Sequence, residues 1–182
     1  MSYLSTWAAG AGQPQVSTLN NPTATIVANA AIVPAGIGGA IAVYPSQDTD
    51  LVVDIDGYFA PPGTGGLSLY AIIPCRVLDT RTSGGAFSGS RNPPVNVAAS
   101  ACLIPATAKA YTLNATVLPV GSLNYLTLWP DGQSMPLAST LNAKDGVTAS
   151  NMAILPNQDG KIDAYASGTT QLIMDIWSYF AP

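Results

Sequence analysis

The sequence predicts an all-β protein built from antiparallel strands. All ten acidic residues are Asp and none is Glu, and Asp is the poorer helix former of the two. Seventeen glycines and fifteen prolines are spread along the 182 residues as breaks between short apolar runs. Within these runs apolar and polar residues alternate, as in a strand with one buried face. These features favour an antiparallel β-sandwich, with a β-barrel as the alternative and almost no helix.

An internal repeat organises the chain, because its last strand has an earlier copy. Residues 171–182 read QLIMDIWSYFAP, and residues 50–61 read DLVVDIDGYFAP. At a shift of 122 residues, YLSTW at 3–7 likewise returns as YLTLW at 125–129. A repeat of this kind indicates two copies of one folding unit.

The repeat divides the chain into one and a half modules. Residues 1–61 match residues 123–182, whereas residues 69–122 have no earlier counterpart. We therefore expect residues 1–61 to be the C-terminal half of a repeat module and residues 69–182 to be a complete module. Residues 62–68 contain Pro and three Gly and would form the linker between them.

Each copy is expected to form the same series of strands, bounded by turn residues. In the first copy the final strand would place Leu51, Val53 and Ile55 on one face. The expected strands of the first copy are residues 3–7, 14–20, 24–33, 39–44 and 50–61. Those of the second copy are residues 125–129, 136–142, 147–155, 160–166 and 171–182, with turns at the Asp-Gly pairs that begin at Asp131, Asp145 and Asp159.

The segment without a repeat adds two expected strands, residues 69–81 and 110–119. A polar, Gly-rich loop over residues 82–92 would separate them. We expect the strand that begins at Tyr125 to pair with residues 110–118.

The strand that begins at Tyr3 has no such partner in its own copy, and an unpaired apolar edge invites pairing. Residues 1–61 are therefore expected to dock on the complete module or to be completed by another chain. The second route would give a homo-oligomer by strand exchange or edge pairing.

Composition argues against several functions. The net charge is −4 and only six residues are Lys or Arg, so no basic stripe is available to bind nucleic acid. No apolar run approaches the roughly 20 residues that span a bilayer, so we expect no membrane insertion. The chain has no His, which excludes a Ser-His-Asp triad and a His-based zinc site.

The two cysteines, Cys75 and Cys102, are consistent with a single disulfide, which would imply an oxidising compartment. The residues alone leave open whether they pair. A nucleophilic cysteine would need a neighbouring base, and no His is present to act as one.

Carboxylates are densest near the end of the first copy. Asp48, Asp50, Asp54 and Asp56 lie within nine residues, and alternation would place the last three on one strand face. Such a group is suited to Ca²⁺, which is the only cofactor that the sequence suggests. The spacing does not match an EF-hand loop, and Asp residues at strand ends also cap turns or bind local backbone amides.

Two further groups have both a structural and a ligand-binding interpretation. Asp79 and Arg81 lie two residues apart on an expected strand and could pair as a buried ionic staple, or Arg81 could bind a carboxylate or phosphate ligand. Trp7 and Trp129 each follow a Tyr by four residues. Their rings could stack on a glycan or lie in the core.

The segments PCR at 74–76 and LDTR at 78–81, with Cys102 downstream and a DIxxYF ending, resemble a β-rich repeat module of secreted bacterial proteins. Such modules are arrayed in tandem or appended to extracellular hydrolases. The resemblance implies a secreted or cell-surface location, a Cys75–Cys102 disulfide and a structural or binding role, and it offers no catalytic residues to carry over. The closing strand usually reads D-x-N/D-G-Y-F, which residues 54–59 fit and residues 175–180 do not.

We therefore expect a non-catalytic extracellular repeat module with a structural, adhesive or binding role. One alternative is a hydrolase that works without His, using Asp, Ser, Thr or Tyr and a divalent cation where one is bound. The second alternative is a carbohydrate-binding module.

Overall fold

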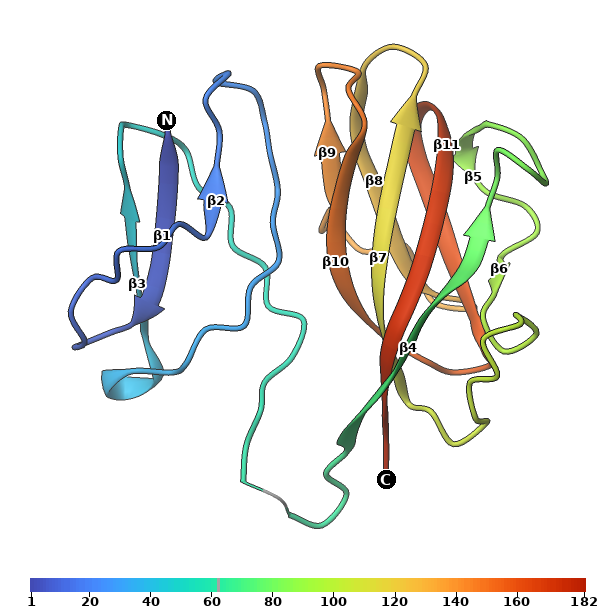
Figure 1. The fold of residues 1–182 in the computed structure, drawn as a ribbon, viewed down its shortest axis with the longest axis horizontal. Helices are drawn as coiled ribbons and strands as arrows, with labels where there is room; N and C mark the ends of the chain where they lie inside the picture. The colour runs from blue at the N-terminus through green and yellow to red at the C-terminus, as the bar shows by residue number, and fades with distance from the viewer. Residues whose placement is uncertain (62) are drawn as a thin grey trace. The chain divides into compact units, whose positions relative to one another are not determined.

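The computed structural model describes residues 1–61 and 63–182, which form two compact units, Met1–Val53 and Asp54–Pro182 (Figure 1). The prediction of an antiparallel all-β protein is confirmed, because every strand pairing in the described residues is antiparallel. The one helical segment described is the short 3-10 turn Ile37–Gly39. Within the described residues, no helix has the length and apolar character needed to cross a membrane.

The second unit is a single eight-stranded sheet. Hydrogen-bonded neighbours follow the order β10-β7-β11-β8-β9, and three further strands, β4, β5 and β6, also pair with β11. The strands are β4 Ser68–Asp79, β5 Phe87–Ser90, β6 Val95–Asn96, β7 Ala110–Pro119, β8 Leu123–Pro130, β9 Leu141–Ala143, β10 Ala149–Pro156 and β11 Lys161–Ala181.

The long strand β11 belongs to two parts of this sheet (Figure 1). Its first half pairs with β8 on one edge and with β5 and β6 on the other. Its second half, from Thr170 onward, pairs with β7 and β4. The register shifts between Ala166 and Thr170, and a strand that changes partners at such a bend turns a corner in the sheet. The sheet folds over along β11 into a nearly closed, barrel-like form.

The hydrophobic core of the second unit lies inside the folded sheet. Inward-facing residues alternate with outward-facing ones along β7 and along both halves of β11. Each fully buried Leu, Ile or Met side chain stabilises the fold by about 1.5–3 kcal/mol relative to an exposed one. The large apolar side chains with no exposed surface include Leu113, Leu123, Leu126, Ile162, Leu172, Met174 and Ile176.

The first unit contains a three-stranded sheet in the order β2-β1-β3. Its strands are β1 Tyr3–Ala8, β2 Leu19–Asn20 and β3 Ile41–Pro45. Leu4 is the one buried apolar residue among residues 1–53, all of which the structure describes. This unit therefore has very little core of its own.

The small sheet repeats the β8–β9–β11 corner of the second unit with the same register. Leu4 pairs with Leu19 on β2 and with Pro45 on β3, as Leu126 pairs with Leu141 on β9 and with Ala166 on β11. Trp7 lies opposite Ala42, as Trp129 lies opposite Asp163. The two halves of the sequence repeat thus form the same local sheet.

Two strands expected in the first copy are absent from the described structure. Residues 24–33 and 50–61 form no strand, although their counterparts lie in β10 and in the second half of β11. The reason is the partner strand: β10 and the second half of β11 both pair with β7, and the first copy has no segment equivalent to β7. A suitable local sequence does not make a strand without a neighbour that accepts its hydrogen bonds.

Two other expectations in the second unit are corrected. Strand β8, which begins at Leu123, was expected to pair with residues 110–118, but its partners are β9 and β11. Strands β5 and β6 were not anticipated, because β5 lies in the polar, Gly-rich stretch, which carries no alternation signal, and β6 is only two residues long. Both form along the edge of β11. The Asp-Gly turns are confirmed, with positive φ at Gly132, Gly146 and Gly160.

Candidate functional site

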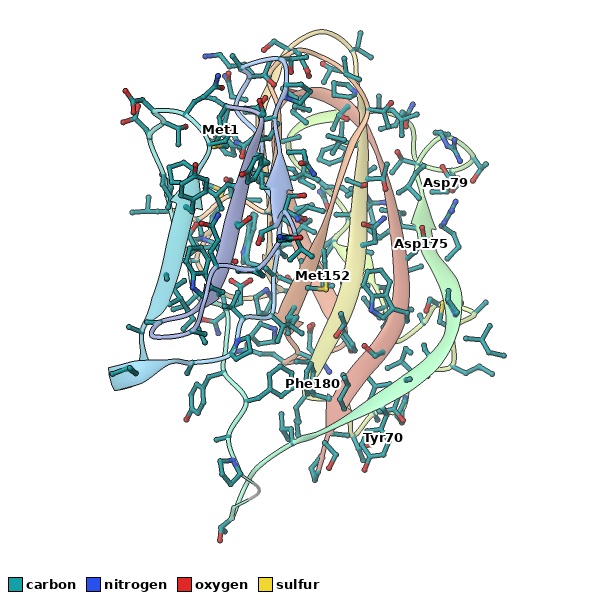
Figure 2. The ribbon with its side chains drawn as sticks, turned by 60° about the vertical axis from the view of Figure 1, so that its left-hand side comes forward. Met1, Tyr70, Asp79, Met152, Asp175 and Phe180 are labelled. Carbon is teal, nitrogen blue, oxygen red and sulfur yellow. A yellow bond between two sulfur atoms is a disulfide. The ribbon has the colours of Figure 1, made fainter. Side chains whose placement is uncertain are left out.

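The densest group of charged side chains lies where β4 ends beside β11. Arg76 and Asp79 lie on β4 and Arg81 follows it in the turn, while Asp175 is the register partner of Arg76 on β11. Figure 2 shows Asp79 and Asp175 on these two neighbouring strands. We call Arg76, Asp79, Arg81 and Asp175 the charged staple.

Asp79 is the centre of the charged staple. Its carboxylate accepts hydrogen bonds from Nε and Nη2 of Arg81, at 2.9 and 2.7 Å, and from the Arg81 backbone N–H at 3.0 Å. Nη1 of Arg76 donates to the same carboxylate at 3.0 Å, while Nε of Arg76 donates to Asp175. Each guanidinium is therefore committed to a carboxylate of the protein, and Asp79 and Arg81 pair as one of the sequence interpretations proposed.

The charged staple is partly exposed and not buried as expected. The side chains of Arg76 and Arg81 are each 47% exposed, and that of Asp79 is 11% exposed. Hydrogen bonding from Arg81 is the main cause that lowers the pKa of Asp79 to about 2. Hydrogen bonding to Asp175 is the main cause that raises the pKa of Arg76. A carboxylate with so low a pKa stays ionised at neutral pH and is a weak general base.

Thr80, between the two charged residues of the motif, fastens β4 to β11 by uncharged contacts. It is buried, its Oγ1 donates to Oε1 of Gln171 at 2.6 Å, and the same oxygen accepts the backbone N–H of Leu172 at 2.8 Å. Its own N–H donates to the Leu172 carbonyl at 3.0 Å. Sequence reasoning assigned Thr80 no role. Its position between Asp79 and Arg81 in the LDTR segment was the one feature of the sequence that could have drawn attention to it.

The expected disulfide is confirmed. Cys75 on β4 is bonded to Cys102, with an S–S distance of 2.01 Å and a sequence separation of 27 residues. The bond ties β4 to the loop that precedes β7, so both strands that flank the second half of β11 are covalently linked through that loop. A disulfide of this kind indicates an oxidising environment.

The acidic residues considered for Ca²⁺ lie outside regular strands. Asp48, Asp50, Asp54 and Asp56 are all exposed, and because residues 50–61 form no strand, alternation does not place them on a shared face. Partial desolvation and then the Asp54 charge raise the pKa of Asp56. Among the described residues there is no group of three or more His, Cys, Asp or Glu side chains suited to holding a metal ion.

The two tryptophans considered for glycan binding serve as loop anchors. Nε1 of Trp129 donates to the carbonyl of Gln133 at 3.0 Å, and Nε1 of Trp7 donates to the carbonyl of Ala11 at 3.0 Å. Trp129 is only 8% exposed and offers no open ring face, whereas Trp7 is half-buried.

Sequence reasoning missed a pair of neighbouring tyrosine rings that occurs in both copies, stacked in the second copy and tilted at 42° in the first. The rings of Tyr125 and Tyr165 lie 5.8 Å apart at an interplanar angle of 22°, and both residues are half-buried. Their counterparts Tyr3 and Tyr44 lie 6.2 Å apart and are 36% and 41% exposed. The expectation had joined each Tyr to a Trp on its own strand, whereas its partner comes from the neighbouring strand.

A second ionic group joins two turns of the complete module. Nζ of Lys161 donates to Asp159 at 2.8 Å and to Asp131 at 3.4 Å. The bond from Lys161 lowers the pKa of Asp159, and the bond to Asp159 raises the pKa of Lys161. As in the charged staple, the cation is bound by carboxylates of the protein; one Lys faces two Asp here, so a net charge of −1 remains.

Comparisons with protein-family models, with curated proteins and with solved structures found no match to this chain. The interpretation of the site therefore depends on its geometry and on the two copies within the chain.

Proposed function

We propose that this chain is a non-catalytic extracellular repeat module, of barrel-like β architecture, with a structural, adhesive or binding role. The observation that carries the proposal is which contacts recur in both copies. Among the described residues, hydrogen bonds to the backbone occur in both, whereas the ion pairs occur in one.

The contacts that the copies share are directed at the backbone. Thr18 Oγ1 accepts the N–H of Thr6 at 3.0 Å, as Thr140 Oγ1 accepts the N–H of Leu128 at 2.9 Å. The loop bonds of Trp7 and Trp129 recur in the same way, and so do those in which the side-chain amides of Asn29 and Asn151 donate to the carbonyls of Thr18 and Thr140. These hydrogen bonds hold loops and strand ends in place, so the contacts common to both copies have a structural role.

The ionic groups do not recur. The counterpart of Lys161 in the first copy is Ala40, and Arg76 and Arg81 lie in the segment that is present once. A reaction centre shared by the repeat would need its reactive groups in both copies. The recurring features support a scaffold role instead.

The two ends of the complete module also favour a display role. Ser68 at the start of β4 is the register partner of Ala181 at the end of β11, so the chain enters and leaves at the same end (Figure 1). Tyr70 and Tyr179 stack there at 5.3 Å, and the Tyr70 hydroxyl donates to the Pro182 carbonyl at 3.2 Å. Both ends of the module are thus held at its base, and the loops at the other end of its strands are the natural places for contacts with a partner.

A secreted or cell-surface setting supports the same role. The Cys75–Cys102 bond is of the kind that persists in an oxidising compartment.

The test is a set of ester, phosphoester and glycoside substrates, assayed with and without EDTA. We expect no turnover above the buffer rate for the wild type. A reproducible turnover that disappears in the Asp54→Ala, Asp56→Ala or Asp175→Ala variant would overturn the proposal and establish the hydrolase alternative.

Carbohydrate binding is a second candidate, favoured by the recurring tyrosine pairs Tyr3–Tyr44 and Tyr125–Tyr165. Partly exposed aromatic faces at equivalent places in both copies suit stacking on sugar rings. Retention of the chain on insoluble polysaccharides should fall in a Tyr3→Ala, Tyr125→Ala double variant and remain unchanged in Tyr58→Ala, which removes an exposed tyrosine outside the pairs. Equal retention of all three proteins would exclude this candidate.

A further inference from the structure

The segment that closes the first copy exposes an apolar stripe. Leu51, Val53 and Ile55 are 48%, 62% and 85% exposed. Their counterparts in the second copy, Leu172, Met174 and Ile176, have no exposed surface. We call residues 50–59 the acceptor segment.

The complete module shows what covers this stripe when it is buried. The second half of β11 lies between β7 and β4, so that Leu172 is opposite Val117 and Ile176 is opposite both Leu113 and Cys75. The core-facing partners Leu113 and Val117 are themselves fully buried. The acceptor segment has the same alternation and lacks both neighbours.

A charged residue of the acceptor segment, Asp54, also has a counterpart whose partner lies on β4. Asp175 on β11 receives Arg76 from β4. Its counterpart Asp54 has no ion pair within the described residues. A strand bearing an Arg opposite Asp54 would restore that pair.

The sheet of the first unit also lacks strands that its counterpart in the second unit has. Strand β3 pairs with β1 alone among the described strands, whereas its counterpart, the first half of β11, also pairs with β5 and β6. The missing neighbours β4, β5, β6 and β7 all belong to one continuous stretch, residues 68–122.

We propose that the acceptor segment is a docking surface for a β-strand donor with the chemistry of residues 68–122. The donor supplies strands on both edges of the acceptor segment, places an apolar side chain at every second position against Leu51, Val53 and Ile55, and presents an Arg to Asp54. Binding converts residues 50–59 from irregular chain into a strand, by the β-augmentation seen in other peptide complexes.

A second copy of this chain cannot supply enough donor segments. Each chain contains one segment of the donor kind, residues 68–122, and two halves that require one, residues 1–61 and 123–182. Exchange among any number of identical chains leaves one half per chain without a donor. Residues 1–182 therefore supply one donor for two halves, so the donor that we propose is a further segment of this type.

The direct test supplies the donor in the same polypeptide. Fusing a second copy of residues 67–122 ahead of Met1 joins Ser122 to Met1, which is the counterpart of Leu123, and so reproduces the natural spacing. The backbone amides of residues 51–58 lie outside any strand and are expected to exchange freely in the parent chain. In the fusion they should become protected to the level of residues 172–179.

The matched control is the same fusion with Leu113→Asp and Val117→Asp in the added copy only. This control should leave residues 51–58 unprotected while the original complete module keeps its protection and serves as the internal reference. Equal exchange of residues 51–58 in the parent chain, the fusion and the control would overturn the proposal.

A second measurement adds the donor as a separate molecule. An oxidised fragment of residues 67–122 should bind the parent chain at a ratio of one to one, and Asp54→Asn should weaken this binding by about two- to fivefold, the range of a partly exposed ion pair. Asp48→Asn is the control and should bind like the parent. If the parent chain alone self-associates with residues 51–58 protected, the occupant is a second copy and the proposed donor is wrong.

Discussion

At the scale of the residue, the module is fastened by a few polar side chains that act on the end of β4. Asp79 accepts from Arg76 and Arg81, and Thr80 between them binds β11 without any charge. The LDTR segment therefore holds β4 by ion pairs of Asp79 and by hydrogen bonds of Thr80, and only the ion pairs depend on pH.

The ionic fastener predicts a loss of stability in acid. The folded-state pKa of Asp79, about 2, lies below its ordinary value of 3.8. The ionised carboxylate consequently stabilises the fold above about pH 4, and this stabilisation is lost as the pH falls toward 2. Asp79→Asn should lower the melting temperature at pH 7 and reduce the further decrease between pH 4 and pH 2, measured by circular dichroism.

The control for this experiment is Asp48→Asn, which alters an exposed carboxylate outside the charged staple. It should keep the acid profile of the wild type. An unchanged decrease between pH 4 and pH 2 in Asp79→Asn would show that other carboxylates cause the loss.

Thr112 on β7 predicts a stabilising substitution. It is 5% exposed, and its hydroxyl is the one buried side-chain polar atom in the described residues without a hydrogen-bond partner. Because an unsatisfied buried hydroxyl is costly, Thr112→Val should raise the free energy of unfolding by about 1 kcal/mol. Denaturant titration measures the change.

Thr116→Val on the same strand is the matched control. The Thr116 hydroxyl accepts a hydrogen bond from Nδ2 of Asn114 at 3.1 Å, so its removal should bring no gain. A loss of stability in Thr112→Val would contradict the assignment of an unpaired hydroxyl.

At the scale of the element, β11 decides the shape of the second unit because it pairs with five other strands. It changes neighbours at a bend between Ala166 and Thr170, and Gly168 lies in that bend. A Cβ atom added at Gly168 would lie 2.7 Å from the backbone oxygen of Ser122, closer than such atoms approach. The bend therefore needs a residue without a side chain.

Gly168→Ala should lower the free energy of unfolding by about 1–3 kcal/mol, since the backbone at Ser122 must move to admit the methyl group. Gly63→Ala is the control, because its added Cβ would meet no atom within 4 Å. Chemical denaturation of both variants gives the comparison, and equal stabilities would show that the bend tolerates a side chain.

At the scale of the whole molecule, the two units differ in how much apolar surface they bury. Leu4 is the one buried apolar residue of Met1–Val53, whereas the core of the second unit draws on β7, β8, β9, β10 and β11. Since burial of apolar side chains is the main stabilising contribution, the units should not unfold together.

Hydrogen exchange should therefore proceed in two stages. Amides of β1 and β3 should exchange well before those of β7 and β11, and heating should give a first transition that leaves the second unit folded. Uniform protection across both units, with a single cooperative transition, would contradict this prediction.

The disulfide belongs to the second unit alone and predicts a selective effect. Closing a loop of 27 residues stabilises the fold by roughly 3–4 kcal/mol in the chain-entropy model. The Cys75→Ser, Cys102→Ser double variant should lower the second thermal transition and leave the first unchanged. The first unit thus acts as a control within the same molecule.

Much of the fold could be predicted because its signals are local. Strands β1, β4, β7 and β10 follow runs of alternating residues, and the paired registers of the two copies follow from the repeat at a shift of 122 residues. The Asp79–Arg81 pair was expected from a spacing of two residues along the chain, and it forms although Arg81 lies in the turn after β4. Each of these depends on residues that are neighbours in sequence.

The failures have a common cause in partners that are distant in sequence. Residues 50–61 carry the pattern of a strand, yet they form none, because β7 and β4 serve only the second copy. Residues 87–90 lack that pattern, yet they form β5, because β11 offers an edge to pair with. The role of Thr80 escaped notice because its partners, Gln171 and Leu172, lie more than 90 residues away.

The sequence by itself determined the antiparallel β class and the repeat, whereas the pairing of Cys75 with Cys102 was established by the structure. Only the tertiary structure decided which of two nearly identical closing segments becomes a buried strand. The physical reason is that a strand is stabilised by hydrogen bonds and side-chain contacts from its neighbours, and these neighbours are present for residues 171–182 and missing for residues 50–61.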